Sequence, residues 1–293
     1  MIILAQKNTH PTSDGAGVKL TRVHGLNDHF LDPFLLIDQI KSDDSKEINK
    51  GFPPHPHRGF ETLTYLKQGA FSHKDSMGNT GKIQSGGAQW MSAGSGVIHS
   101  EMPEKFESQT VGFQLWINLP AKNKMKRPEY QDVKNTEMPW VKFSGAKVKV
   151  IGGNIQINKQ QLSGPLQSLP ANISVVDIEL DAQQTLDIDT QNRKTMLLVY
   201  KGKLKDAKSN TVLNVEAKKL KLEADDKKTE LLLLVGEPIN EPIAHYGPFV
   251  MNSQKEIDQA VNDYNNGTLV QEQPDIKSSK LNYQPTIQMR NKK

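Results

Sequence analysis

The chain has 293 residues and a formal net charge of +4, with 37 lysines and arginines against 33 acidic residues. This length is enough for two domains with ordinary hydrophobic cores, and no apolar run approaches the length of a membrane span. The absence of cysteine excludes disulfides and thiolate ligands. Arginine occurs only at positions 22, 58, 127, 193 and 290, which disfavours direct nucleic-acid binding. Because the first residues lack a signal-peptide pattern, we expect a cytoplasmic protein.

One predicted strand contains two histidines, His55 and His57, which are separated by one residue. Pro54 and Pro56 favour extended backbone around them. They also place this segment at a sheet edge or barrel rim, because proline cannot donate to a central ladder. β-branched and aromatic residues predict that the next strand covers 59–66 and is ended by Gln68 and Gly69. In an extended strand, side chains at i and i+2 project from one face, roughly 7 Å apart along the backbone.

A second pair of potential ligands with the same spacing, His99 and Glu101, follows a glycine-rich stretch over 86–96. Glycines there suit tight turns with positive φ angles, so the pair is expected on another strand. Two such pairs on neighbouring strands can converge on one cation with three imidazoles and one carboxylate. The sequence therefore predicts one metal site inside a β-barrel, with four ligands: His55, His57, His99 and Glu101.

The rest of the chain is expected to form a second β-unit and one helix. A polar stretch over 122–139 follows a predicted closing strand at 111–119. Short apolar runs then recur at intervals typical of a β-sandwich or barrel. They lie at 148–151, 174–180, 186–188, 196–200 and 231–235. A capping box and an apolar face predict a helix over 253–267, and the polar segment 271–293 is expected to be loosely held.

These patterns predict a mainly β fold with two domains. The first, residues 1–131, is expected to hold the metal. The second, residues 132–293, contains a single histidine, His245, and therefore offers no comparable ligand set.

Several ordered motifs resemble the pirin family, which is part of the cupin superfamily. Residues 54–65 (PHPHRGFETLTY) resemble the first cupin motif, and residues 96–99 (GVIH) resemble the end of the second, with Gly94 where a proline is usual. Other pirin-like segments lie at 75–79, 89–94, 99–103, 114–120 and 247–252. The matches run from about residue 22 to residue 267, so the resemblance covers most of the chain.

The resemblance implies a bicupin, with two barrels of the double-stranded β-helix type. It implies Fe(II) as the metal, with Mn, Ni, Co, Cu or Zn as alternatives. It also implies quercetin 2,3-dioxygenase activity, in which O2 cleaves a flavonol with loss of carbon monoxide. In that interpretation Glu101 is both a ligand and the general base that takes the proton of the flavonol hydroxyl. The alternative is a non-enzymatic iron-binding partner of transcription factors or metabolic enzymes, a role found for some pirins.

Two sets of residues are expected to lie outside the metal shell. Glu61 occupies the position of a ligand in many cupins, but the pirin-like Glu101 favours Glu61 as a hydrogen-bond partner or barrel-wall residue. The remaining histidines are expected at the surface or in caps: His10, His24, His29, His73 and His245.

Overall fold

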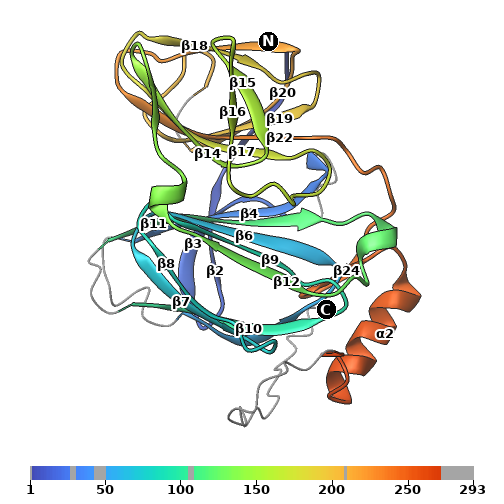
Figure 1. The fold of residues 1–293 in the computed structure, drawn as a ribbon. Helices are drawn as coiled ribbons and strands as arrows, with labels where there is room; N and C mark the ends of the chain where they lie inside the picture. Colours follow the sequence, from blue (N-terminus) through green and yellow to red (C-terminus); the bar gives the residue numbers. More distant parts are fainter. Residues whose placement is uncertain (1, 27–30, 43–50, 105–108, 208–209, 272–293) are drawn as a thin grey trace.

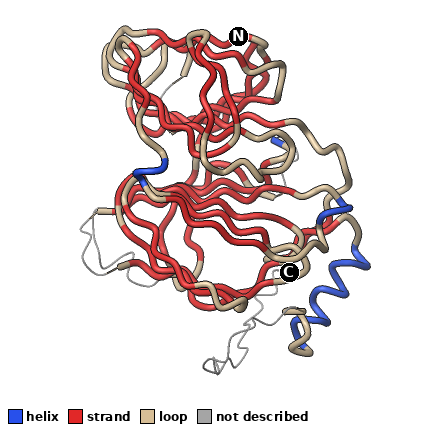
Figure 2. The backbone as a smooth tube through the Cα atoms, in the orientation of Figure 1, coloured by secondary structure: helices blue, strands red, loops and turns tan. Residues whose placement is uncertain are grey.

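The computed structural model describes residues 2–26, 31–42, 51–104, 109–207 and 210–271. Strands dominate these residues, and they form two β-units stacked on one another (Figure 1). The α-helix α2 (Gln254–Asn265), which is the long helix in Figure 2, lies near the C-terminal end of the described chain. The expected fold, mainly β with two barrel-like units and a C-terminal helix, is thus confirmed. No helix among the described residues has both the length and the apolarity needed to cross a membrane.

The first unit consists of two antiparallel sheets. A seven-stranded sheet has the order β12-β9-β6-β11-β4-β3-β2, and a four-stranded sheet has the order β5-β10-β7-β8. The strands are β2 (His10–Asp14), β3 (Val18–His24), β4 (Phe34–Ser42), β5 (Phe52–His57), β6 (Phe60–Gln68), β7 (Ala70–Asp75), β8 (Thr80–Gln84), β9 (Ala88–Ser92), β10 (Val97–Pro103), β11 (Thr110–Asn118) and β12 (Glu129–Val133). Strand β5, with its prolines, is an edge strand as predicted.

The second unit repeats this arrangement of a large and a small sheet. The large sheet has the order β1-β20-β19-β22-β17-β14-β13, and the small sheet has the order β16-β15-β18-β21. Its strands are β1 (Ile2–Asn8), β13 (Val141–Phe143), β14 (Ala146–Gly152), β15 (Asn154–Ile157), β16 (Gln160–Ser163), β17 (Ser174–Leu180), β18 (Thr185–Asp189), β19 (Lys194–Lys201), β20 (Thr211–Glu216), β21 (Lys219–Glu223) and β22 (Thr229–Gly236). Two short 3-10 helices flank β12 along the chain: η2 (Ala121–Asn123) precedes it, and η3 (Asn135–Glu137) lies between the two units.

The two large sheets pack face to face, with β6 and β11 opposite β17 and β22 in Figure 1. Leu63 and Phe113 from the first unit share one buried cluster with Leu198 and Leu232 from the second. The hydrophobic effect at this sheet-on-sheet contact holds the units together.

Buried charges reinforce the contact between the units. Lys67 of β6 forms ion pairs with Glu230 (2.7 Å) and Glu179 (3.1 Å) of the second unit. Nearby, the Tyr65 hydroxyl donates a hydrogen bond to the fully buried carboxylate of Asp177 (2.7 Å). Because these groups are paired, the interface accommodates them without leaving an uncompensated charge.

The interiors of the two units differ. Aliphatic side chains such as Val148 and Ile178 fill the inside of the second unit. The inside of the first unit contains only small apolar clusters, one of which includes Ile40 and Phe71, next to an open cavity. The first unit therefore has interior room for a ligand.

The ends of the described chain cross between the units. Strand β1 pairs with β20 in the second unit. Conversely, β23 (Ala244–Tyr246), β24 (Phe249–Met251) and α2 (Gln254–Asn265) lie against the first unit, where Phe249 bridges to Arg58. The Ser253 side chain accepts a hydrogen bond from the Glu256 amide, which confirms the predicted N-terminal cap of the helix. The prediction for the tail over 271–293 falls almost wholly outside the described residues.

Candidate metal centre

Two adjacent strands bring the predicted ligand pairs together. Strands β5 and β10 are antiparallel, with His99 directly opposite His55 and Val97 opposite His57. The pairing shifts by one residue between His99 and Glu101. The i, i+2 spacing thus places His55 and His57 on one face of β5, as the sequence predicted, and His99 joins them from β10.

The three imidazoles form a compact group. One nitrogen from each of His55, His57 and His99 lies within 4.8 Å of the others, and the ring centroids are 4.4 to 4.9 Å apart. Three equally spaced nitrogens bound to one ion at about 2.1 Å lie at most about 3.6 Å from one another, so metal binding draws the three rings closer together. This is the one such group found among the residues that the structure describes.

Three ring nitrogens of this group have no hydrogen-bond partner among the described residues. His57 Nδ1 and both ring nitrogens of His99 are buried without a hydrogen bond. Burial lowers the pKa of His57 and of His99 well below its usual value, and the neighbouring His55 lowers both further. Both rings are therefore neutral, which is the form that binds a metal. His55 Nδ1 lies 2.8 Å from the Pro53 carbonyl oxygen, so this nitrogen carries the proton and Nε2 is left free. Unpaired, buried, neutral nitrogens of this kind fit a divalent ion.

Glu101 lies close to this group but outside it. Its side chain is buried, and its oxygens are not among the ligand atoms that fall within 4.8 Å of one another. Thr64 Oγ1 lies 3.0 Å from Glu101 Oε1 and 2.7 Å from Gln114 Oε1. A hydroxyl has one proton to donate, and a carboxylate is the stronger acceptor. Thr64 therefore holds one oxygen of Glu101, while the role of Glu101 as a fourth ligand stays a prediction.

Glu61 is a barrel-wall residue. It is fully buried on β6, where Oε2 accepts a hydrogen bond from Trp90 Nε1 (2.8 Å) and Oε1 pairs with Lys126 (3.1 Å). Burial raises the pKa of Glu61, although Lys126 and Trp90 act in the opposite direction. The structure thus agrees with the interpretation that excludes Glu61 from the metal shell.

The surface assignment of the other histidines is wrong for His73 and His24, which are 1% and 4% exposed. His73 lies opposite Glu101 on β7, and its ring is 5.2 Å from that of His99. The alternation of Phe71, His73 and Asp75 along β7 was a usable signal for an inward-facing histidine. His10 is exposed, His245 is half-buried, and His29 lies outside the described residues.

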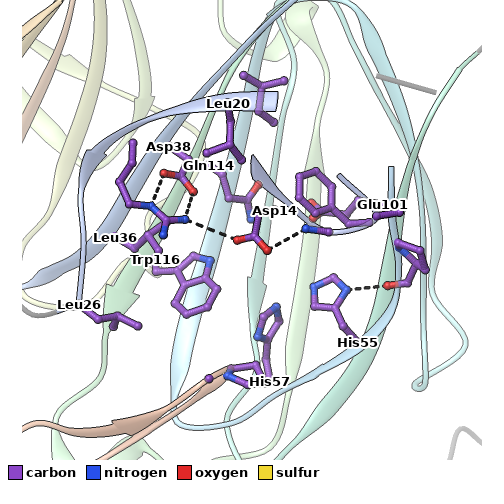
Figure 3. A pocket seen from close by; sticks show the side chains of 18 of the residues that line it. Asp14, Leu20, Leu26, Leu36, Asp38, His55, His57, Glu101, Gln114 and Trp116 are labelled. Carbon is purple, nitrogen blue, oxygen red and sulfur yellow. Dashed lines mark hydrogen bonds and ion pairs between the residues drawn. The ribbon is translucent and has the colours of Figure 1, made fainter. Parts of the chain in front are cut away.

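A cavity of about 540 Å³ opens from the candidate centre, within the size range of small-molecule sites, about 300–1,000 Å³. His55, His57 and Glu101 line one part of it, and Leu20, Leu36 and Trp116 form apolar walls (Figure 3). The indole of Trp116 meets the His57 ring edge-on at 5.2 Å. The cavity therefore offers a flat, apolar surface beside the three imidazoles.

A charged group that the sequence motifs did not reveal lines the same cavity. Arg22 Nε and Nη2 donate to the two oxygens of Asp38 at 2.8 and 2.6 Å, and Asp14 Oδ2 lies 3.5 Å from Nη2. The hydrogen bond to Asp38 raises the pKa of Arg22, so the guanidinium is charged. In Figure 3, Asp38 lies on the side away from His55, with Asp14 between them. These residues come from β2, β3 and β4, far from the ligand motifs in sequence.

Two buried cations fix the strand that carries His57. Arg58 is 1% exposed and donates from Nε to the Ser95 carbonyl (2.6 Å) and from Nη1 to Asp263 on α2 (2.6 Å). Lys124 Nζ donates to the carbonyls of Gly59 (2.8 Å) and Val250 (3.1 Å), and burial lowers its pKa to about 8. The segment that follows the second unit thus anchors the corner between β5 and β6.

Gly59 at this corner is required by the close packing. Its φ is +85°, and a Cβ there would lie 2.1 Å from the Val250 carbonyl oxygen. Only glycine permits both the left-handed backbone and the approach of β24.

Comparison with known proteins agrees with this architecture. The family model described as pirin matches residues 17–117, and the model of the pirin C-terminal cupin domain matches residues 175–270. A Vibrio cholerae protein, provisionally named quercetin 2,3-dioxygenase, is 46% identical over 88% of this chain and 93% of its own. Human pirin is 36% identical over 87% of this chain and 89% of its own.

Solved structures show the same fold. A crystal structure of quercetin 2,3-dioxygenase from Acinetobacter baumannii superposes with a TM-score of 0.82 at 32% identity, over 92% of this chain and 98% of the other. A bacterial pirin from Escherichia coli, in complex with nickel(II), matches in fold with a TM-score of 0.58 at 19% identity, over 80% of this chain and all of the other. Two pirin family models match the two β-units in chain order, and relatives share 36% and 46% of the aligned residues. The chain therefore belongs to the pirin family.

Proposed function

We propose that this protein is a metal-dependent dioxygenase that cleaves a flavonol such as quercetin with O2. The observation that carries the proposal is the group of three imidazoles, two of which, His55 and His57, line a cavity with apolar and aromatic walls. The names of the similar Vibrio cholerae and Acinetobacter baumannii proteins support the substrate class. The cysteine-free composition supports a cytoplasmic location.

We assign one divalent ion to His55, His57 and His99, with Glu101 as the fourth ligand. Three neutral imidazoles and one carboxylate leave a net charge of +1 on a divalent ion. The set resembles the two-histidine, one-carboxylate sites of iron enzymes, which favours Fe(II). The nickel(II) complex of the Escherichia coli pirin supports other divalent ions as substitutes. The bound ion supplies Lewis acidity, which lowers the pKa of a flavonol hydroxyl and orients the ring.

The residues around the site supply binding and proton transfer. Trp116 offers its indole face to an aromatic ring, next to His57. Thr64 holds Oε1 of Glu101, which leaves Oε2 as the ligand atom. Once Glu101 has loosened from the ion, Oε2 accepts the hydroxyl proton. The apolar walls Leu20 and Leu36 exclude water from the substrate.

The substitution Glu101→Gln tests the proposal. An amide cannot take up the proton at neutral pH, so oxidation of quercetin per bound metal should fall by about 10²–10⁴. The variant His99→Ala should lose metal and activity together. Glu216→Gln, at an exposed position in the second unit, is the matched control and should behave like wild type.

Turnover is measured aerobically from quercetin absorbance and normalised to bound metal by elemental analysis. If Glu101→Gln oxidised quercetin at the wild-type rate per bound metal, Glu101 would not be the general base. If the wild type showed no turnover with any divalent ion, the dioxygenase proposal would fail. The regulatory binding role would then be the better account.

A further inference from the structure

Three charged side chains line the cavity together with the histidines: Asp14, Arg22 and Asp38. One positive and two negative charges leave this group with a net charge of −1. The candidate metal end, with a divalent ion and Glu101, carries positive charge instead. One part of the cavity is therefore negative and the other positive, so the two parts select different chemical groups of a ligand.

Asp14 is the member of this group with acceptor capacity to spare. Both oxygens of Asp38 are occupied by Arg22 at 2.6–2.8 Å. Asp14 Oδ1 accepts a hydrogen bond from the Gly15 amide at 2.7 Å, but among the described residues Oδ2 has only the 3.5 Å contact with Arg22. The Asp14 side chain is 55% exposed, so an incoming ligand can reach it.

The backbone holds Asp14 at a fixed place relative to the histidines. Asp14 ends β2 opposite Val18, and the turn that follows is seated against the start of β5. There the Ala16 amide donates to the Gly51 carbonyl at 3.1 Å. A Cβ on Gly15, which has a φ of +59°, would lie 2.5 Å from the Phe52 ring. The strand that carries His55 therefore also positions the turn that presents Asp14.

We propose that Asp14 accepts a hydrogen bond from a hydroxyl group of the substrate, at a point away from the metal ligands. Asp14 is then a specificity-determining residue. It favours neutral, polyhydroxylated aromatic molecules and disfavours ligands that bring a carboxylate or sulfonate to this end. The inference rests on the proposed function and deepens it by naming the substituent that the cavity recognises.

The chemistry of the cavity supports this discrimination. A hydroxyl that donates to a carboxylate forms a charge-assisted bond, stronger than a bond between neutral groups. An anionic substituent would meet the net negative charge of Asp14 and Asp38. Trp116 and Leu36 line the same cavity and offer apolar contact to the rings of the ligand.

The test compares the binding of two flavonols to the full-length protein. Quercetin carries several hydroxyls, whereas 3-hydroxyflavone keeps only the adjacent hydroxyl and ketone of the heterocyclic ring. Protein loaded with nickel(II) is titrated under argon, so that no oxidation occurs, and quenching of tryptophan fluorescence reports binding beside Trp116. The variants are Asp14→Ala and Asp14→Asn, and Asp206→Asn in an exposed turn of the second unit is the charge-matched control.

Asp14→Ala should weaken quercetin binding about tenfold and leave 3-hydroxyflavone binding within about twofold, since only the former has a hydroxyl for this position. Asp14→Asn should bind a ring-sulfonated quercetin more tightly than wild type does, because the variant lacks the carboxylate that repels the sulfonate. Asp206→Asn should change neither.

Equal effects on both flavonols, or no effect on either, would overturn the role of Asp14. If the wild type still oxidised quercetin in air, that result would leave the proposed function intact. If the wild type bound neither flavonol, the proposed function would fail, and the inference would fail with it.

Discussion

Replacing Arg58 by methionine should destabilise the first unit and loosen its metal site. Arg58 follows His57 directly, is 1% exposed, and ties β5 to Ser95, to Asp263 and, at 3.4 Å, to the Leu269 carbonyl. Methionine keeps much of the aliphatic stem but leaves Asp263 and the Ser95 carbonyl without their donor. Loss of one partner from a buried ion pair costs about 3–5 kcal/mol. Because the Asp263 side chain is still 17% exposed, we expect the lower value, about 3 kcal/mol.

Urea unfolding followed by tryptophan fluorescence measures this loss. Lys82→Met is the matched control, since it removes the exposed ion pair between Lys82 and Glu104 and should cost at most about 1 kcal/mol. The metal affinity of Arg58→Met should also fall, because His57 is no longer held by its neighbour. If Arg58→Met lost no more stability than Lys82→Met, the anchoring role of α2 would be wrong.

Three further predictions concern the ligands, the cavity wall and the contact between the units. His57→Ala should reduce the metal content from one ion per chain to none by elemental analysis, because one histidine of the first pair is not enough. Trp116→Leu should weaken quercetin binding about tenfold in a fluorescence or calorimetric titration, since the aromatic face is lost. Burial raises the pKa of Glu179, but hydrogen bonds from Lys228 and the charge of Lys67 outweigh it and hold that pKa at about 2. Because the unfolded value is about 4.3, Glu179 stabilises the fold fully above that pH, and the stabilisation is lost as the pH falls towards 2. The difference in unfolding free energy between wild type and Glu179→Gln should shrink over this range, and a difference that did not change with pH would contradict the ion pairs.

The sequence predicted those parts of the site that depend on local geometry. The i, i+2 spacing of His55 and His57 decides which face of β5 they share, whatever the rest of the chain does. Pro54 and Pro56 likewise restrict β5 to an edge through their missing amide protons. The cap at Ser253 depends only on residues within one turn of α2.

The parts that the sequence did not reveal depend on which strands become neighbours. His73 faces the centre because β7 pairs with β10, a contact between segments about 30 residues apart. Asp14 and Asp38 reach the cavity only because their strands close the large sheet over it. Arg58 looks like a solvated charge until Asp263, 205 residues later, is placed beside it. The alternation along β7 indicates that His73 faces inwards, but no local pattern encodes which distant segments become neighbours.

The most direct test of the account is the yield of carbon monoxide from quercetin in air. The protein is loaded with Fe(II), and bound metal, quercetin consumed and carbon monoxide released are measured on the same sample. We predict one carbon monoxide per quercetin consumed, in proportion to bound metal, and none from His99→Ala. Stoichiometric metal without carbon monoxide, for iron and for each of the other divalent ions, would contradict the dioxygenase assignment.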